Sequence, residues 1–240
     1  MTKQLIKYNV GTKSYLGTLL KAPIEKPKAA VVLLPDWRGQ SALAYDHANH
    51  LIKLGASVLI ADLYGDGFNP DKPEQVGSMV QQLIEKRNQS VQALTACLKQ
   101  FKNEVPSETP IFLLGFSAGG MIALDYGRSK ADDIDGIILC SALLKLARPE
   151  MNTHINAPVL ILQGTQDKVS PLEIINEVIK EMDDACNDVQ FGLYTQTHHA
   201  FDNPDVGTDP SARLVYSEKS MQRAWQFITN FLINTCKPDA

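Results

Sequence analysis

A serine lies between glycines at a point where the chain changes character. Ser117 stands in the segment GFSAGG of residues 115–120, which has the pattern GxSxG. The apolar run Pro110–Leu114 comes directly before this segment, and the helical pattern of Met121–Arg128 follows it. A serine on such a sharp strand-to-helix turn projects its hydroxyl above the end of a sheet, and the glycines permit close packing of strand and helix. This context predicts a nucleophilic serine.

The GxSxG pattern alone is weak, because at about 7% Gly and Ser a chain of this length contains it by chance about one time in ten. The alternative is a loop serine that caps a helix, since serine is a favoured N-cap. Position favours the nucleophile, because the turn follows the fifth expected strand and a further glycine, Gly120, comes next. Backbone N–H groups at the helix start would then face a developing oxyanion.

A base for Ser117 is sought among five histidines: His47, His50, His154, His198 and His199. An α/β-hydrolase orders its triad as serine, acid and histidine, so the base follows a late strand. Only His198 and His199 do so, after the expected strand Val189–Tyr194. Adjacent side chains diverge, so at most one reaches Ser117, and residue chemistry leaves both open. His47 and His50 fall in an expected helix as surface or half-buried side chains, and His154 falls in a loop.

The acid is expected in the loop after the seventh strand, Pro158–Leu162. Asp167 lies there, in the segment GTQDKVSP of residues 164–171. A buried carboxylate at this place would orient the imidazole and stabilise the imidazolium formed in the reaction. The alternative is a simple turn residue between Gly164 and Pro171. Three other aspartates come just before the sixth strand, so we expect them away from the site as solvated charges: Asp132, Asp133 and Asp135.

Two main-chain N–H groups would form the oxyanion hole. One belongs to Ala118, after the nucleophile, and the other to Trp37, in the segment LPDWRG of residues 34–39 after the third strand. We assign Asp36, Trp37 and Tyr64 to substrate binding. Packing of the Trp37 indole against the next helix is an equal alternative. A structural role is as well supported for Tyr64, which lies in the turn-rich segment DLYGDG of residues 62–67.

Strand-length apolar runs alternate with amphipathic helical patterns, which predicts an α/β fold with a mostly parallel sheet. Most runs are continuous, as expected when helices cover both faces of the sheet. Eight strands are expected: Gln4–Val10, Ser14–Lys21, Ala29–Leu34, Ser57–Ala61, Pro110–Leu114, Gly136–Cys140, Pro158–Leu162 and Val189–Tyr194. The first two are close enough to pair as an antiparallel hairpin. Apolar spacing predicts a helical face over Val76–Phe101 and a C-terminal helix that includes Met221–Leu232.

The length of 240 residues and the near-average composition suit a single domain over residues 1–240. The short stretch from Cys140 to Pro158 leaves little room for a lid. A net charge of −4 argues against a nucleic-acid partner. No apolar run is long enough to cross a bilayer and the first residues do not resemble a signal peptide, so we expect no membrane partner and a cytoplasmic location.

The four cysteines form no CxxC pair, so a zinc site is not expected: Cys97, Cys140, Cys186 and Cys236. Cys97 and Cys140 are expected as small buried side chains. The expected chemistry needs neither a metal nor an organic cofactor. The sequence leaves a monomer and a homodimer open.

Together these segments resemble the dienelactone hydrolase family of α/β-hydrolases over nearly the whole chain. The landmarks are LPDWRG at 34–39, ADLYG at 61–65, GFSAGG at 115–120, GTQD at 164–167 and HAFDN at 199–203. In that family the histidine precedes a small residue and a phenylalanine, so the resemblance favours His199 over His198. It implies an α/β-hydrolase fold without a large lid and a triad of Ser117, His199 and Asp167.

Three positions depart from the family's best-known pattern. The family commonly has cysteine where this chain has Ser117, and a glutamate that contacts the resting nucleophile where this chain has Asp36. An arginine often stands where this chain has Asn203. These departures favour a general hydrolase of small carboxylic esters, lactones included, over a dedicated dienelactone hydrolase. The alternatives are a peptidase or thioesterase with the same triad and an inactive binding protein on the same fold.

Overall fold

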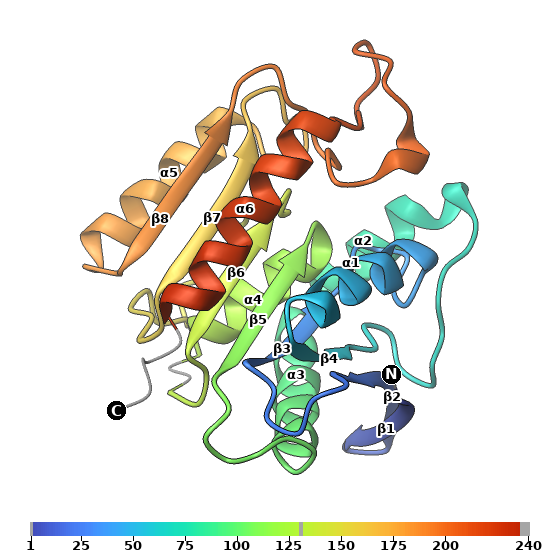
Figure 1. Ribbon diagram of the computed structural model, residues 1–240. Helices are drawn as coiled ribbons and strands as arrows, with labels where there is room; N and C mark the ends of the chain where they lie inside the picture. Colours follow the sequence, from blue (N-terminus) through green and yellow to red (C-terminus); the bar gives the residue numbers. More distant parts are fainter. Residues whose placement is uncertain (1, 130–131, 236–240) are drawn as a thin grey trace.

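Eight strands form one sheet in the order β1-β2-β4-β3-β5-β6-β7-β8 (Figure 1). The computed structural model describes residues 2–129 and 132–235. The strands are β1 (Thr2–Val10), β2 (Lys13–Lys21), β3 (Ala29–Leu34), β4 (Ala56–Ile60), β5 (Ile111–Phe116), β6 (Gly136–Cys140), β7 (Val159–Gly164) and β8 (Val189–Tyr194). β1 and β2 pair antiparallel, as does β2 with β4, and the pairs from β4 to β8 are parallel. The expected mostly parallel sheet with an antiparallel start is confirmed.

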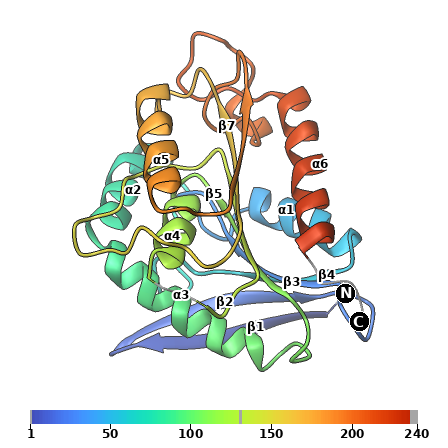
Figure 2. The same ribbon diagram turned by 90° about the vertical axis from the view of Figure 1, so that its left-hand side faces the viewer.

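Helices cover both faces of the sheet (Figure 2). α1 (Ala42–Lys53) and α6 (Glu218–Thr235) lie on one face. The other face carries α2 (Val76–Glu85), α3 (Arg87–Lys102), α4 (Ala118–Gly127) and α5 (Leu172–Asp184). Two short 3-10 helices, η1 (Pro73–Gln75) and η2 (Pro204–Val206), lie in loops.

The continuous apolar runs divide their side chains between two cores. In β3, Ala30, Val32 and Leu34 pack in the core under α2 to α5. Their neighbours Val31 and Leu33 pack in the core under α1 and α6. Side chains of a strand alternate between the faces, so a strand that is covered on both faces must be apolar at every position.

The expected strands are confirmed, with bounds that differ by at most two residues at either end. The stretch from Val76 to Phe101, by contrast, is two helices, because Lys86 leaves the helical conformation between α2 and α3. The break lets the two helices take different directions. It also begins α3 with Arg87, a buried cation rather than an apolar residue.

A buried ion-pair network explains why that cation is inside. The Arg87 guanidinium pairs with Asp125 of α4, and Arg128 bonds to both Asp125 and Glu181 of α5. The remaining donors reach main-chain carbonyls of Lys145 and Leu146, in the loop after β6. Buried charges are tolerated when they are paired and hydrogen-bonded, and this network ties three helices to that loop.

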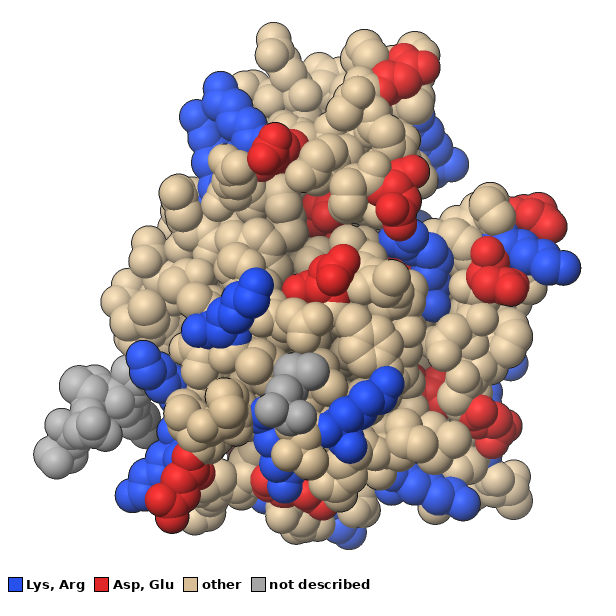
Figure 3. Space-filling model, turned by 45° about the vertical axis from the view of Figure 1, so that its right-hand side comes forward, with Lys and Arg blue, Asp and Glu red and all other residues tan. Residues whose placement is uncertain are grey.

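Charged side chains of both signs are interspersed over the face of the molecule in Figure 3, consistent with the small net charge of −4. Within the described ranges, none of the helices has the length and apolar character needed to cross a membrane. Cys97 and Cys140 are buried, as expected. Cys186 is exposed, and Cys236 lies outside the described residues.

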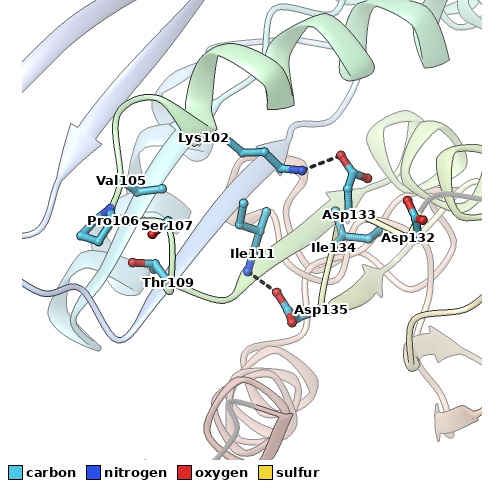
Figure 4. A pocket seen from close by; sticks show the side chains of 10 residues that line it. All are labelled: Lys102, Val105, Pro106, Ser107, Thr109, Ile111, Asp132, Asp133, Ile134 and Asp135. Atoms are coloured by element: carbon cyan, nitrogen blue, oxygen red, sulfur yellow. Dashed lines mark hydrogen bonds and ion pairs between the residues drawn. The ribbon is translucent and has the colours of Figure 1, made fainter.

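The three aspartates before β6 lie at the amino ends of the parallel strands, as expected (Figure 4). Asp132 is exposed, as expected, whereas Asp133 and Asp135 are not simply solvated. Asp133 pairs with Lys102 and accepts a hydrogen bond from Tyr126, and Asp135 accepts the N–H of Ile111. Hydrogen bonding to Lys102 and Tyr126 lowers the pKa of Asp133 despite its partial burial. These carboxylates therefore anchor the far end of the sheet, opposite the turn that holds Ser117.

The first turn of α4 packs directly on the end of β3. A Cβ placed on Gly119 would lie 2.1 Å from the carbonyl oxygen of Leu34 and 2.4 Å from that of Pro35. Both atoms are backbone, so they cannot move aside as a flexible side chain would. Gly119 is thus required by the approach of two backbones.

We predict that Gly119→Ala lowers the free energy of unfolding by more than about 2 kcal/mol, because the added methyl separates α4 from β3. Chemical denaturation measures this change. The matched control is Gly77→Ala, since Gly77 is also the second residue of a helix and a Cβ there meets nothing within 4 Å. The control should lie within about 1 kcal/mol of the wild type. Equal stability of the two variants would contradict the packing argument.

Candidate active site

Ser117, His199 and Asp167 form a continuous hydrogen-bonded chain. The Oγ of Ser117 lies 2.9 Å from Nε2 of His199. The Nδ1 of the same ring lies 2.7 Å from Oδ2 of Asp167. His199 and Asp167 are buried, whereas Ser117 is partly exposed. Three residues that are far apart in the sequence are therefore brought together with the serine at the open end.

Each member of this chain follows the carboxyl end of a parallel strand. Ser117 follows β5, Asp167 follows β7 and His199 follows β8. Ser117 has φ 46° and ψ −117°, a strained conformation for a residue with a Cβ. Its carbonyl accepts hydrogen bonds from the N–H groups of Gly120 and Leu143, at 3.0 and 2.8 Å. The surrounding backbone therefore holds the serine in this conformation.

Asp167 is oriented by its own loop. Its Oδ1 accepts the N–H groups of Val169 and Ser170, at 2.7 and 2.8 Å, which leaves Oδ2 for His199. The Ser170 hydroxyl in turn donates to the carbonyl of Ala142 after β6. The sequence offered Asp167 either as a turn residue or as the acid that orients the histidine. In the structure one oxygen of its carboxylate bonds to the turn and the other contacts His199.

The structure distinguishes the two adjacent histidines. His199 has its ring between Ser117 and Asp167, whereas His198 is half-buried and makes no contact with either within the described residues. The geometry thus agrees with the resemblance. His154 is exposed and its ring contacts the carbonyl of Ala185 after α5, so it does not belong to the site.

The loop after β3 supplies the remaining predicted site residues. Neither the N–H of Trp37 nor that of Ala118 donates to another group in the described part of the chain. The Tyr64 hydroxyl donates to the carbonyl of Trp37 at 2.6 Å. Burial, together with the nearby Asp36, raises the pKa of Tyr64. Tyr64 is buried, and its hydroxyl supports the loop that carries Trp37. Its contacts therefore fit the structural alternative better than a role in lining a substrate pocket.

Comparison with known proteins agrees with this geometry. The sequence profile described as the Dienelactone hydrolase family matches residues 16–236. The chain belongs to this family. It is 23% identical over 223 residues to a protein of Aquifex aeolicus (strain VF5) that is provisionally named a carboxymethylenebutenolidase, covering 90% of this chain and 93% of that protein.

Two solved structures are also similar. One, titled m3DLH, is 28% identical with a TM-score of 0.89, covering 98% of both chains. The other is titled a dienelactone hydrolase-like promiscuous phosphotriesterase, P91, from metagenomic libraries, and is 23% identical with a TM-score of 0.89 over 98% of both chains. The fold is that of the α/β-hydrolases, with an eight-stranded sheet and no large lid in the described residues.

Asp36 stands where members of the dienelactone hydrolase family commonly carry glutamate, and its carboxylate is engaged elsewhere. Both oxygens contact the Arg38 guanidinium, the shortest contact being 2.9 Å, and Oδ1 accepts the N–H of Arg38. Arg38 also reaches Asp205 at 3.1 Å, in the loop that follows His199. The Asn203 side chain caps that loop by accepting the N–H of Asp205. Asp36 and Arg38 therefore link the loop after β3 to the loop that follows His199.

Sequence reasoning missed a buried acid and imidazole beside the site. Asp202 and His47 are each 5% exposed, and Oδ2 of Asp202 lies 3.8 Å from Nε2 of His47. His47 was expected at the surface or half-buried, which is wrong because it is buried and its ring stacks on Phe116, next to Ser117. Burial, with Asp36 nearby, raises the pKa of Asp202 to about 7, and burial lowers the pKa of His47 to about 3. An amphipathic pattern cannot show that a polar side chain faces inward.

His50 is half-buried, as expected, and stacks on Trp225 of α6. Among the described residues, no group of three or more His, Cys, Asp or Glu side chains is arranged to hold a metal ion.

We predict that replacement of Asp202 by asparagine stabilises the protein more at pH 8 than at pH 4.5. Between its unfolded pKa near 3.8 and its folded pKa of about 7, the folded state holds the proton more tightly. The free energy of unfolding therefore falls as pH rises through this window, by at most about 1.4 kcal/mol per pH unit, and levels off above it.

The melting temperature from pH 4.5 to 8 measures this effect, as the difference between Asp202→Asn and the wild type. Asparagine has no proton to lose, so the difference should grow with pH up to about 7 and then stay constant. A difference that is constant over the whole range would contradict the argument.

Proposed function

We propose that this member of the dienelactone hydrolase family is a serine hydrolase that cleaves small carboxylic esters, lactones included, through an acyl-enzyme on Ser117. The observation that carries the proposal is the chain of contacts from Ser117 through His199 to Asp167, at 2.9 and 2.7 Å. A nucleophile, a base within hydrogen-bond reach and a buried acid that orients the base are what acyl transfer requires.

In the first step His199 Nε2 takes the Ser117 proton as Oγ bonds to the ester carbonyl carbon. The imidazolium that forms is stabilised by the Asp167 carboxylate at Nδ1. The carbonyl oxygen becomes an oxyanion, for which the N–H groups of Trp37 and Ala118 are the proposed donors. As the tetrahedral intermediate collapses, the bond to the alcohol oxygen breaks and His199 returns the proton to that oxygen.

In the second step water replaces the alcohol. His199 takes a proton from the water, whose oxygen attacks the acyl-enzyme, and the acid product leaves as Ser117 regains its proton. Two contacts support the assignment of the oxyanion donors. The first turn of α4 touches the end of β3 at Gly119, and the Tyr64 hydroxyl bonds to the carbonyl of Trp37 and so holds the loop that follows β3.

Esters are favoured over other acyl substrates by the family and by the names of relatives. The similar Aquifex aeolicus protein has a lactone-hydrolase type of name, and a fold relative from Lactobacillus plantarum WCFS1 is titled a carboxylesterase. A hydroxyl nucleophile with its own base suits activated and simple esters. The departures at Ser117, Asp36 and Asn203 keep a dedicated dienelactone substrate out of the proposal.

We predict that a fluorophosphonate labels the protein stoichiometrically at Ser117. Intact mass followed by peptide mapping measures the adduct. Ser117→Ala should lose the adduct, and it and His199→Ala should lower kcat by about 10⁴-fold or more, because the triad acts as one unit. His198→Ala is the matched control for the base and should keep labelling near the wild-type rate.

Two outcomes would contradict the assignment. Loss of labelling in His198→Ala but not in His199→Ala would reverse the choice of base. Absence of an adduct on folded wild-type protein would favour an inactive binding protein. Turnover of p-nitrophenyl esters, an acyl thioester and an aminoacyl anilide of equal chain length would separate the esterase from the thioesterase and peptidase alternatives.

A further inference from the structure

Ser141, the first residue after β6, touches three of the segments that surround the site. Its N–H donates to the carbonyl of Leu162 in β7, at 2.9 Å. Its carbonyl accepts the N–H of Ser117, at 3.2 Å. Its hydroxyl oxygen accepts the N–H of Ala200, at 2.7 Å. This residue therefore connects the nucleophile turn directly to the loop that carries His199.

The backbone of Ser141 indicates that the hydroxyl is needed. Its φ is 48°, in the left-handed region that glycine adopts without steric cost and residues with a Cβ disfavour. The side chain is 0% exposed. If only the shape of this turn mattered, glycine would serve better. A serine that is strained and fully buried is explained by the bond that its hydroxyl accepts.

That bond completes the fixation of one peptide unit. The carbonyl of His199 accepts the N–H of Val215 at 3.1 Å, and the N–H of Ala200 donates to Ser141. Both polar groups of the His199–Ala200 peptide are therefore bound, on opposite sides. A peptide plane that is held at both ends fixes the direction in which the preceding side chain leaves the backbone.

We propose that Ser141 is a positioning residue for the base, and this inference rests on the proposed function. Its hydroxyl holds the His199–Ala200 peptide against the nucleophile turn, so that Nε2 of His199 stays within reach of Ser117 Oγ. Ser141 does not touch substrate, because it is fully buried. Its contribution is orientation, and a displacement of about 1 Å can cost up to about 100-fold in rate.

The test compares Ser141→Gly and Ser141→Ala with Ser57→Ala. Glycine accepts the left-handed backbone, so Ser141→Gly keeps the turn and loses only the hydroxyl. Ser57 is the matched control, because it is also buried and its Oγ also accepts a main-chain N–H, that of Ala22 at 3.2 Å, at the far end of β4. The measurements are kcat and KM for p-nitrophenyl butyrate, the second-order rate of fluorophosphonate labelling, and the melting temperature.

We expect both Ser141 variants to lose about tenfold or more in kcat and in labelling rate, with KM within twofold of the wild type. Ser57→Ala should keep kcat and the labelling rate within twofold of the wild type, even if its melting temperature falls as far as those of the Ser141 variants. Labelling of Ser141→Gly at the wild-type rate would overturn the inference. So would an equal loss of kcat in Ser57→Ala, or a rise in KM with unchanged kcat.

The proposed function fails in a different way. Wild-type protein without an adduct would overturn the nucleophile assignment and this inference with it. If the wild-type protein is labelled and Ser141→Gly reacts with the fluorophosphonate at the same rate, this inference alone is overturned. If Ser141→Ala does not fold because its Cβ keeps the strained left-handed backbone without the bond to Ala200, Ser141→Gly, which relieves that strain, decides the question.

Discussion

The direct contact between the first turn of α4 and the end of β3 governs the rest of the site. With no side chain at Gly119, the backbone of α4 reaches the carbonyls of Leu34 and Pro35. This contact brings the residue after the nucleophile close to the loop that holds Trp37. It also forces Ser117 into its strained conformation, because the chain must turn from strand to helix within one residue. The position of the proposed nucleophile and of its two proposed oxyanion donors therefore depends on one backbone approach.

The loop after β6 is a common support for the other parts. Leu143 donates to the carbonyl of Ser117, Ala142 accepts the hydroxyl of Ser170 beside the acid, and Ser141 accepts the N–H that follows the base. The buried network around Arg128 fixes the continuation of this loop at Lys145. The proposed nucleophile, acid and base thus share one neighbour, and each supporting bond uses a main-chain atom at one end at least.

Much of this arrangement could be predicted from the sequence, because it depends on local signals. Ser117 is marked by its glycines, and the strands by continuous apolar runs whose two faces are both covered. The break at Lys86 could not be predicted, because the apolar spacing continues across it, and the burial of Arg87 depends on a distant partner, Asp125. The depth of His47 and Asp202 and the bond from Ala200 to Ser141 are likewise long-range facts. The spacing of residues in the sequence indicates which helix or strand a residue belongs to. It says little about which distant residues pack against that helix or strand.

The bond from Val215 to His199 has a consequence for the order in which function arises. The turn that holds Ser117 is bonded to Ser141 and Leu143 after β6, but the loop of its proposed base is closed by Val215, almost a hundred positions after Ser117. During synthesis the ribosome must release the chain beyond Val215 before that loop can close. A nascent or truncated chain would carry a shaped serine that has no base to deprotonate it. The proposed hydrolysis would then begin only when the chain through Val215 is in place.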